Sequence, residues 1–280
     1  DLGNYPDDNK DWYKNPVVAS LFEPGSVFKP IIMASALEKG VINQDSTCDI
    51  CTGPIEIGQF SIKTWDEVYH PDSNMTDILV NSDNIGMVYV SRKLGSENFL
   101  KTLDNFGFNA ITGIELQEEV TSKLKTGSSF REIDLATNAF GQGIAITRIQ
   151  LLTAFNALAN KGLLVQPTLI EKEDQPPSRK VLEENTTKQI TQMLMEVVNQ
   201  SKLNWKRPQG LSIAGKTGTA QIPVDGKYDQ NKTIASFIGY FPAYNPKYTM
   251  LVTLTEPTAS PWGSETAAPL WFKILNQLLL

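Results

Sequence analysis

The sequence predicts an α+β protein with two lobes, in which an antiparallel β-sheet flanked by helices lies beside a mostly helical lobe. Apolar residues recur at helical spacing through much of the first 165 residues, whereas three strand-like runs follow one another between residues 211 and 255. The C-terminal segment Thr266 to Leu280 predicts a helix that closes the sheet. We therefore expect one domain over residues 1–280, with a helical lobe over about 26–165, a sheet lobe over about 166–280 and a site in the crevice between them.

The first helix is predicted directly after the turn Glu23-Pro24-Gly25. Apolar residues recur at helical spacing from Phe28 to Leu37, and Gly40 ends the run. Ser26 is expected at the N-terminus of this buried helix, with Lys29 one turn later on the same face. The N–H groups at that end lack helical partners and carry partial positive charge, which can stabilise an oxyanion. The pattern predicts a serine nucleophile with a lysine as its base.

A second polar string, Ser82-Asp83-Asn84, interrupts two predicted helices, Met75 to Val80 and Ile85 to Leu94. Such a junction can aim a hydroxyl and an amide into a cleft, where Ser82 would relay a proton and Asn84 would hold the amide oxygen of a substrate. An ordinary polar turn that caps the second helix explains the same string equally well when it is taken alone.

Downstream of the helical region the sequence predicts strands. A short strand is expected near Thr168 to Ile170, followed by the loop Gln175-Pro176-Pro177-Ser178 and a helix that begins near Thr186. Three further runs predict an antiparallel sheet, with a polar loop over residues 223–232 after the first of them: Leu211 to Ile222, Thr233 to Phe241 and Tyr248 to Thr255.

The third polar string, Lys216-Thr217-Gly218-Thr219, lies on the first strand of this sheet. Glycine has no side chain, so Gly215 and Gly218 allow the backbone of the strand to approach a ligand closely. The hydroxyls of Thr217 and Thr219 are candidates to hold a substrate carboxylate. A lone Lys-Thr-Gly on a strand is more often structural than catalytic, so this string gains its meaning from the other two.

The chain repeats all three patterns elsewhere, and the second Ser-x-Asn, Ser96-Glu97-Asn98, is better explained as the N-cap of a helix. Ser122 and Lys125 form a second Ser-x-x-Lys, and Lys125-Thr126-Gly127 is a second Lys-Thr-Gly. Both lie in a polar stretch without helical or strand periodicity and are interpreted as loop. Because short patterns of common residues arise by chance, the element that carries each string decides between them.

The chain has a single histidine, His70, in a turn-like segment, and no Gly-x-Ser-x-Gly elbow, so a Ser-His-Asp triad is poorly supported. A lysine can replace histidine as the base only if its pKa falls toward neutrality. Burial disfavours the ammonium, and a second cation nearby disfavours it further, so Lys216 close to Lys29 would let Lys29 accept the proton of Ser26. The backbone N–H groups of Ser26 and Thr219 are expected to form an oxyanion hole.

Composition is that of an ordinary globular chain, with 41% hydrophobic and 20% charged residues among 280. The net charge of −6 and the lack of a basic stripe argue against nucleic acid as a partner. No run reaches the roughly 20 apolar residues of a membrane span.

Cys48 and Cys51 form a Cys-x-x-Cys, but two cysteines and one histidine cannot build a four-ligand zinc site, so no metal or other cofactor is expected. A local disulfide and two free thiols are equally compatible with this spacing.

Together the three strings form the set found in penicillin-binding proteins and class A β-lactamases. Over nearly its whole length the chain resembles the transpeptidase domain of a class B penicillin-binding protein, of the penicillin-binding protein 2 or cell-division transpeptidase type. The resemblance implies the penicillin-binding-protein/β-lactamase-like transpeptidase fold. The similar segments extend beyond the three strings: Glu23-Pro24-Gly25-Ser26, Phe106-Gly107-Phe108, Thr112 to Leu116, Ala139 to Thr147, Ala157 to Gly162 and Lys216 to Gln221.

The resemblance implies a peptidoglycan D,D-transpeptidase, in which a serine attacks a D-Ala-D-Ala stem peptide, releases D-Ala and passes the acyl group to the amine of another strand. In this sequence Ser26 would be the acylated nucleophile and Lys29 its base. β-Lactam antibiotics would acylate the same serine. The other implied residues are, for catalysis, Ser82, Asn84 and Lys216 and, for substrate binding, Thr217, Gly218 and Thr219.

The resemblance also implies a longer parent protein, because the chain begins at Asp1 and its domain would be truncated at the N-terminus. Such a parent would carry a membrane anchor, place this domain outside the cytoplasmic membrane and act with a membrane glycosyltransferase. In the family, strands before the nucleophile complete a five-stranded sheet, whereas Asp1 to Trp12 offer no alternating apolar run. We therefore expect three strands with an uncovered edge, and lower stability than in a chain extended upstream.

Two other functions are compatible with these residues. A serine β-lactamase would hydrolyse its acyl-enzyme quickly. Class A enzymes of that kind carry a Glu-x-x-Leu-Asn string, and the nearest string here, Glu196-Val197-Val198-Asn199, lies on a predicted helix. A class D enzyme would favour Ser-x-Val over Ser82-Asp83-Asn84. A non-catalytic β-lactam sensor would be acylated without turning over a peptide.

Overall fold

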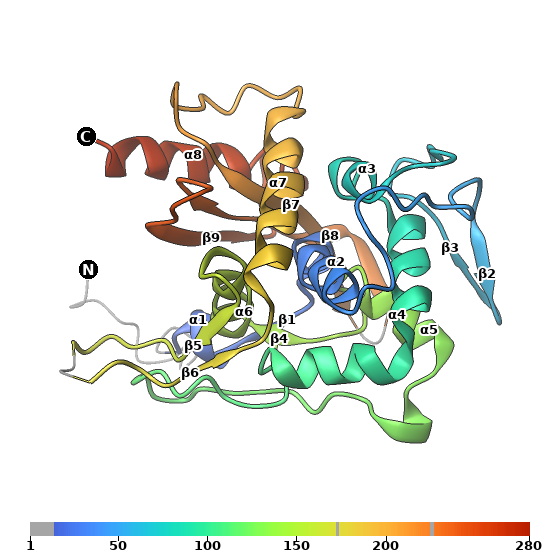
Figure 1. The fold of residues 1–280 in the computed structure, drawn as a ribbon, viewed down its shortest axis with the longest axis horizontal. Helices are drawn as coiled ribbons and strands as arrows, with labels where there is room; N and C mark the ends of the chain where they lie inside the picture. The colour runs from blue at the N-terminus through green and yellow to red at the C-terminus, as the bar shows by residue number, and fades with distance from the viewer. Residues whose placement is uncertain (1–13, 172–173, 225–226) are drawn as a thin grey trace.

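The computed structural model describes residues 14–171, 174–224 and 227–280. Helices gather around α2 (Lys29–Glu38), and a three-stranded antiparallel sheet adjoins them (Figure 1), which confirms the predicted α+β class. The other helices are α1 (Pro16–Ala19), α3 (Met75–Val80), α4 (Asn84–Asn105), α5 (Glu132–Asn138), α6 (Arg148–Ala159), α7 (Glu184–Asn199) and α8 (Ala267–Leu278), with 3-10 turns η2 (Gly25–Phe28) and η3 (Gly127–Ser129).

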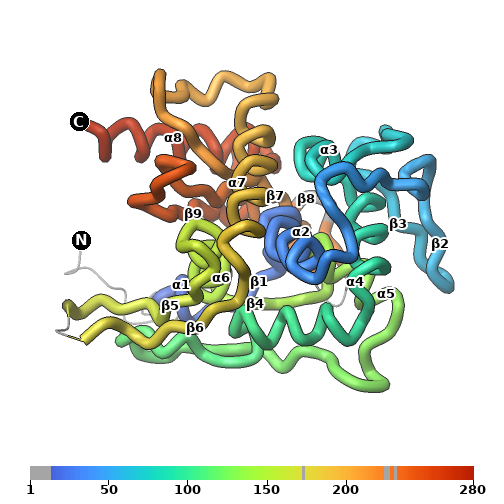
Figure 2. Tube along the Cα trace, in the orientation of Figure 1, coloured from blue at the N-terminus to red at the C-terminus, as the bar shows by residue number. Residues whose placement is uncertain are grey.

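Helix α2 lies at the centre of the protein, between α4 and α7 (Figure 2). Every residue of α2 from Lys29 to Leu37 is buried, as expected of a helix that is apolar on most faces. Its last residue, Glu38, accepts hydrogen bonds from Glu183 N (3.0 Å) and Thr186 Oγ1 (2.5 Å) at the start of α7. An acidic side chain is favourable there because the N-terminus of a helix carries partial positive charge. These contacts fix α7 to the end of α2.

The main sheet has the order β7-β8-β9 and contains the three strands that the sequence predicts: β7 (Ala214–Val224), β8 (Lys227–Phe241) and β9 (Tyr248–Thr255). Successive side chains of a strand point to opposite faces. Phe237 and Phe241 of β8 therefore pack against α8, whereas Ile238 and Tyr240 join the core of the helical region. The sheet is thus covered on both faces, and β7 and β9 form its edges.

Three small sheets hold the connecting segments. The strand just before the nucleophile, β1 (Leu21–Phe22), pairs with β4 (Ile146–Thr147). Strands β2 (Ile55–Ile57) and β3 (Phe60–Ile62) form a hairpin, and β5 (Leu163–Val165) pairs with β6 (Ser178–Lys180). Strands of two or three residues are too short to show an alternating pattern, so the sequence does not predict the first two of these sheets.

Two predicted boundaries in the strand regions are wrong. The strand expected near Thr168 to Ile170 lies instead at Leu163–Val165, because the backbone N–H of Leu169 and the hydroxyl of Thr168 bind Glu115 rather than a neighbouring strand. The polar loop expected over residues 223–232 is largely strand, since β7 continues to Val224 and β8 begins at Lys227. A polar run can form a ladder wherever a partner strand lies alongside it.

The predicted helix at the nucleophile also begins differently. Ser26 lies in the 3-10 turn η2, and the α-helix proper starts at Lys29. Cys48 and Cys51, whose state the spacing leaves open, form a disulfide. Among the described residues we find no helix with the length and apolar character needed to cross a bilayer. The expectation about Asp1 to Trp12 concerns positions outside the described residues.

Candidate active site

The turn that carries Ser26 is held from behind by a second turn. Gly25 adopts a φ of +60°, and its N–H donates to the carbonyl of Gly141 at 3.0 Å. A Cβ on Gly141 would lie 2.2 Å from the oxygen of Gly25, so only glycine fits there. The pairing of β1 with β4 brings the two turns together. The Gly141-Gln142-Gly143 segment therefore fixes where the nucleophile turn lies.

Lys29 is fully buried, and its side chain connects the helix that follows Ser26 with the Ser82-Asp83-Asn84 string. Its Nζ donates to Ser82 O (2.5 Å), to Ser82 Oγ (3.3 Å) and to Asn84 Oδ1 (2.9 Å). Burial lowers the pKa of Lys29 well below its usual value, the charge of Lys216 lowers it further, and the carboxylate of Asp83 partly opposes both. A lysine in this environment loses its proton far more readily than one in water.

The junction between α3 and α4 has the geometry needed to present Ser82. Ser82 adopts a φ of +54°, which is uncommon for a residue with a side chain. The next residue, Asp83, caps α4 by accepting from Ile85 N (2.7 Å) and Gly86 N (3.1 Å). The string is therefore both a helix cap and a carrier of polar groups, because Asp83 makes the cap while Ser82 and Asn84 contact Lys29.

Asn84 is oriented by a segment that the sequence does not single out. Its Oδ1 accepts from Lys29, and its Nδ2 donates to the carbonyl of Lys63 at 3.0 Å. Two residues later, the indole N–H of Trp65 donates to the carbonyl of Asn81 at 3.2 Å. The segment after β3 thus supports the Ser82-Asp83-Asn84 string by two hydrogen bonds, and no pattern in the sequence marks this role.

Lys216 approaches the same hydroxyl from β7. It is 1% exposed, and its Nζ donates to Ser82 Oγ at 3.0 Å and to Thr217 O at 3.1 Å. Burial lowers the pKa of Lys216 to about 7. Two buried lysines therefore meet at one serine hydroxyl, which is the like-charge arrangement expected from the sequence. Proton exchange between them through Ser82 is geometrically possible.

Strand β7 runs directly against the nucleophile turn. A Cβ on Gly218 would lie 2.9 Å from Val27 Cγ1, and one on Gly25 would lie 3.1 Å from Ala220 Cβ. This close approach brings the backbones around Ser26 and Thr219, the two predicted oxyanion donors, to the same place. The hydroxyl oxygen of Thr219 accepts from Gly263 N at 3.0 Å, which leaves its proton available for a ligand.

These groups surround a cleft of about 530 Å³. Trp65 and Trp262 form part of its wall, with ring centroids 5.3 Å apart in an edge-to-face arrangement. Lys29 and Lys216 lie buried below. The structure therefore brings the eight residues predicted for catalysis and substrate binding to one place. Six of them line the cleft: Ser26, Ser82, Asn84, Thr217, Gly218 and Thr219.

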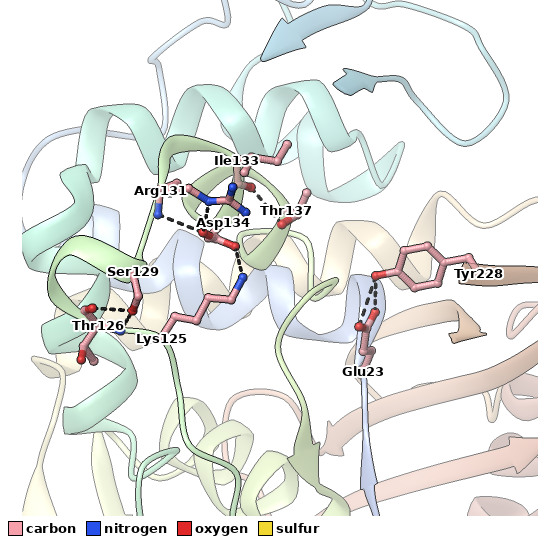
Figure 3. A network of polar contacts seen from close by, with 9 residues as sticks. All are labelled: Glu23, Lys125, Thr126, Ser129, Arg131, Ile133, Asp134, Thr137 and Tyr228. Carbon is pink, nitrogen blue, oxygen red and sulfur yellow. Dashed lines mark hydrogen bonds and ion pairs between the residues drawn. The ribbon is translucent and has the colours of Figure 1, made fainter. Parts of the chain in front are cut away.

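The repeated patterns lie elsewhere and are engaged in other contacts. The Nζ of Lys125 forms an ion pair with Asp134 Oδ1 at 2.7 Å, and its side chain is 51% exposed (Figure 3). The hydroxyl of Ser122 donates to the carbonyl of Ala145. His70 is half-buried in a turn. Over the described ranges there is no group of three or more His, Cys, Asp or Glu side chains that could hold a metal ion.

Comparison with known proteins points to one family. The family profile described as "Penicillin binding protein transpeptidase domain" matches residues 3–278. The chain is 34% identical over 279 residues to Stage V sporulation protein D of Bacillus subtilis, covering 95% of this chain and 43% of that protein. It is 29% identical over 274 residues to peptidoglycan D,D-transpeptidase FtsI of Escherichia coli, covering 96% and 46%. The chain thus spans less than half the length of these relatives.

Solved structures agree with this relationship. The transpeptidase domain of penicillin-binding protein 3 from Burkholderia pseudomallei superimposes with a TM-score of 0.88 at 25% identity, over 96% of this chain and 82% of that one. Apo penicillin-binding protein 3 from Mycobacterium tuberculosis gives a TM-score of 0.86 at 28% identity, over 95% and 64%. These values confirm the fold expected from the sequence.

Proposed function

We propose, from the premise that the chain belongs to the class B branch of the penicillin-binding protein transpeptidase family, that it is a serine-type peptidoglycan D,D-transpeptidase which binds β-lactams covalently. The observation that carries the proposal is the meeting of two buried lysines, Lys29 and Lys216, at Ser82 in a cleft lined by Ser26. A serine with lysine bases and without an available histidine suits acyl transfer.

In the first half-reaction, Ser26 Oγ attacks the carbonyl carbon of the penultimate D-Ala of a stem peptide. Its proton passes to the neutral amine of Lys29, whose pKa is lowered by burial and by Lys216. The N–H groups of Ser26 and Thr219 stabilise the resulting oxyanion. The carbon–nitrogen bond then breaks, the leaving amine receives a proton from the Lys29–Ser82–Lys216 cluster, and D-Ala departs.

In the second half-reaction, the amine of another strand attacks the ester carbonyl of the acyl-enzyme. That amine loses a proton to the lysine cluster, the bond between carbon and Ser26 Oγ breaks, and the oxygen regains its proton. The new amide is the cross-link. Asn84 would orient the amide of the donor peptide, while Thr217, Gly218 and Thr219 would bind it, with the terminal carboxylate on the two hydroxyls and Lys216 nearby.

The substrate class determines where such an enzyme works. Peptidoglycan lies outside the cytoplasmic membrane, so we propose an extracytoplasmic site of action, with a membrane anchor and a glycosyltransferase partner that involve sequence beyond these residues. We also propose that residues 1–280 act as one transpeptidase domain with lobes over about 26–165 and 166–280. The cleft lining supports this division, because it draws residues from both ranges.

The proposal is tested by labelled penicillin and by a donor peptide that ends in D-Ala-D-Ala. We expect one adduct per chain by intact-mass spectrometry, located at Ser26 by peptide mapping, and its loss in Ser26→Ala. With an amine acceptor, D-Ala release should accompany formation of the new amide. An adduct at Ser122, or one that survives Ser26→Ala, would show that the nucleophile is misassigned. Acylation without any peptide turnover would instead favour a sensor.

A further inference from the structure

A contact outside the lysine cluster joins the nucleophile segment to the hairpin of the main sheet. Glu23 lies three residues before Ser26, and Tyr228 lies at the start of β8. The Tyr228 hydroxyl donates to the Glu23 carboxylate, at 2.9 Å from Oε2 and 3.2 Å from Oε1 (Figure 3). We call these two residues the Glu23–Tyr228 clasp.

The clasp holds its carboxylate in a partly dehydrated place. Glu23 is half-buried, and burial raises its pKa, while the hydroxyl of Tyr228 and the backbone of Gly143 act in the opposite direction. Withdrawing a carboxylate from water costs free energy unless hydrogen bonds replace the hydration. Tyr228 supplies such a bond to a charged acceptor, which is a stronger kind than one between neutral groups. Tyr228 itself is 42% exposed, so it is the Glu23 side of the contact that is withdrawn from water.

The ladder of the hairpin is irregular close to Tyr228. The pairing of β7 with β8 is in register from Ala214 to Gln221, then shifts between Gln221 and Pro223. Beyond the shift, the ladder contains two further pairs, Pro223 with Tyr228 and Val224 with Lys227. A bulge disrupts the ladder locally and bends the strand. The far end of the hairpin is thus held by Glu23 as well as by the sheet.

The same two segments carry the predicted oxyanion donors. Ser26 follows Glu23 along the chain, and Thr219 lies on β7 in the hairpin that Tyr228 belongs to. The two backbones already touch at Gly25 and Gly218, where no Cβ fits without displacement. A shift of the hairpin relative to Glu23 would change the separation of the two N–H groups. Rates of acyl transfer depend steeply on such geometry.

We infer that Glu23 and Tyr228 form a positioning pair, which holds the β7–β8 hairpin against the nucleophile turn and so sets the spacing of the Ser26 and Thr219 amides in the oxyanion hole. This inference rests on the proposed function, because the oxyanion hole has its meaning in acyl transfer. Neither side chain lines the cleft, so the pair acts through the backbone that it positions.

The test measures acylation of the 280-residue chain by benzylpenicillin, resolved into a noncovalent dissociation constant and an acylation rate constant. Tyr228→Phe removes the hydroxyl alone. We expect the acylation rate constant to fall about 10-fold while the dissociation constant changes less than about 2-fold, since donor spacing affects the transition state more than initial binding. Amide hydrogen exchange of β7 and β8 should become faster in the same variant, a readout that does not need acylation.

Two further comparisons make the test specific. Tyr248→Phe makes the same change on β9, where Tyr248 is 52% exposed, and should alter neither acylation nor exchange. In a double-mutant cycle, Glu23→Gln combined with Tyr228→Phe should cost about as much as Tyr228→Phe alone, because once the hydroxyl is gone the charge of Glu23 has no Tyr228 hydrogen bond left to strengthen. Additive losses would show that the two residues act separately and would overturn the inference.

The remaining outcomes separate this inference from the proposed function. If the unaltered chain is acylated but Tyr228→Phe leaves either the rate constant or hairpin exchange unchanged, the inference is wrong and the function stands. An equal loss in rate and affinity with a lowered melting temperature would indicate a structural role alone and would also overturn it. If the unaltered chain is not acylated at all, the proposed function falls, and the positioning role of the clasp in acyl transfer falls with it.

Discussion

Lys29 and Lys216 illustrate how burial changes the chemistry of a residue that is usually a solvated cation. Neither side chain has appreciable contact with water, and both hydrogen-bond to the hydroxyl of Ser82. Desolvation is the largest cause of the lowered pKa of each. Lys125 belongs to the second Ser-x-x-Lys and the second Lys-Thr-Gly of the chain, and its side chain is half-exposed and forms an ion pair with Asp134. The difference between a base and a surface cation therefore lies in the surroundings and not in the residue type.

Replacing Lys29 by Met should all but abolish acylation, because it removes the proposed acceptor of the Ser26 proton while roughly preserving side-chain volume. We expect a loss of about 10³-fold in the acylation rate, in the range for removal of a general base. Lys125→Met should leave the rate nearly unchanged, since Lys125 lies outside the cleft lining. Labelled penicillin and rapid quenching measure both. Equal losses in the two variants would mean that the wrong Ser-x-x-Lys has been identified.

The pH dependence of acylation should reflect Lys216. In the proposed mechanism Lys29 must be neutral, which favours high pH. We expect Lys216 to act as a cation near the substrate carboxylate, a form that is lost as pH rises through its pKa of about 7. A bell-shaped profile should result, with an alkaline limb near neutrality. Lys216→Arg keeps the positive charge at all these pH values, so its alkaline limb should move upward even if the maximal rate is lower. An identical limb in both proteins would exclude Lys216 as its origin.

Among the elements, strand β7 and the turn η2 show how backbone contact builds a site. Gly218 has an ordinary backbone conformation, but the space for a Cβ is occupied by Val27 Cγ1 at 2.9 Å and Val27 N at 3.1 Å. A larger residue would push β7 away from the turn that carries Ser26. The glycine is required here for closeness rather than for flexibility.

Gly218→Ala should therefore lower the acylation rate by about 10-fold or more through displacement of β7, with a smaller effect on folding. Gly53→Ala is a matched control, because a Cβ at that position would have no neighbour within 4 Å and the φ of Gly53 is not positive. Acylation kinetics and thermal melting of both variants provide the measurement. A wild-type rate in Gly218→Ala would show that the strand can retreat without disturbing the oxyanion donors.

Across the protein as a whole, the position of carboxylates relative to the cleft favours a slow acyl-enzyme. Glu196, in the string nearest to the β-lactamase pattern, lines a separate hollow of about 440 Å³ together with Tyr244. Among the described residues that line the catalytic cleft, the one carboxylate is Glu265, which accepts a hydrogen bond from Ser260 at 2.6 Å. Glu196 thus lies outside the cleft lining, and the Glu265 carboxylate already accepts a hydrogen bond from a neighbouring side chain.

The acyl-enzyme formed with a penicillin should consequently persist for many minutes or longer. Its decay can be followed by intact-mass spectrometry after removal of excess drug, with hydrolysis of a chromogenic cephalosporin as an independent measure. Hydrolysis as fast as acylation would contradict this expectation and favour the β-lactamase alternative.

Several elements and the chemistry of their side chains could be predicted from the sequence. Apolar periodicity predicted α2, α3, α7 and α8, and alternation predicted the three main strands, because these signals arise from residues close together in the chain. The three polar strings named six of the residues that line the cleft for the same reason, since each string is local. Very short strands and the exact extent of the β7–β8 hairpin escaped prediction, because a strand exists only where another strand pairs with it.

How those residues meet depends on the three-dimensional packing. Strings separated by more than 50 residues converge on Ser82, and this requires α2 between α4 and α7 with β7 against η2. The support of Asn84 by Lys63 and the clasp between Glu23 and Tyr228 join segments with no shared pattern. The lowered pKa values of the two lysines likewise follow from burial, which is a property of the folded chain. Local sequence sets which group is present, and long-range packing sets its distances and its access to water.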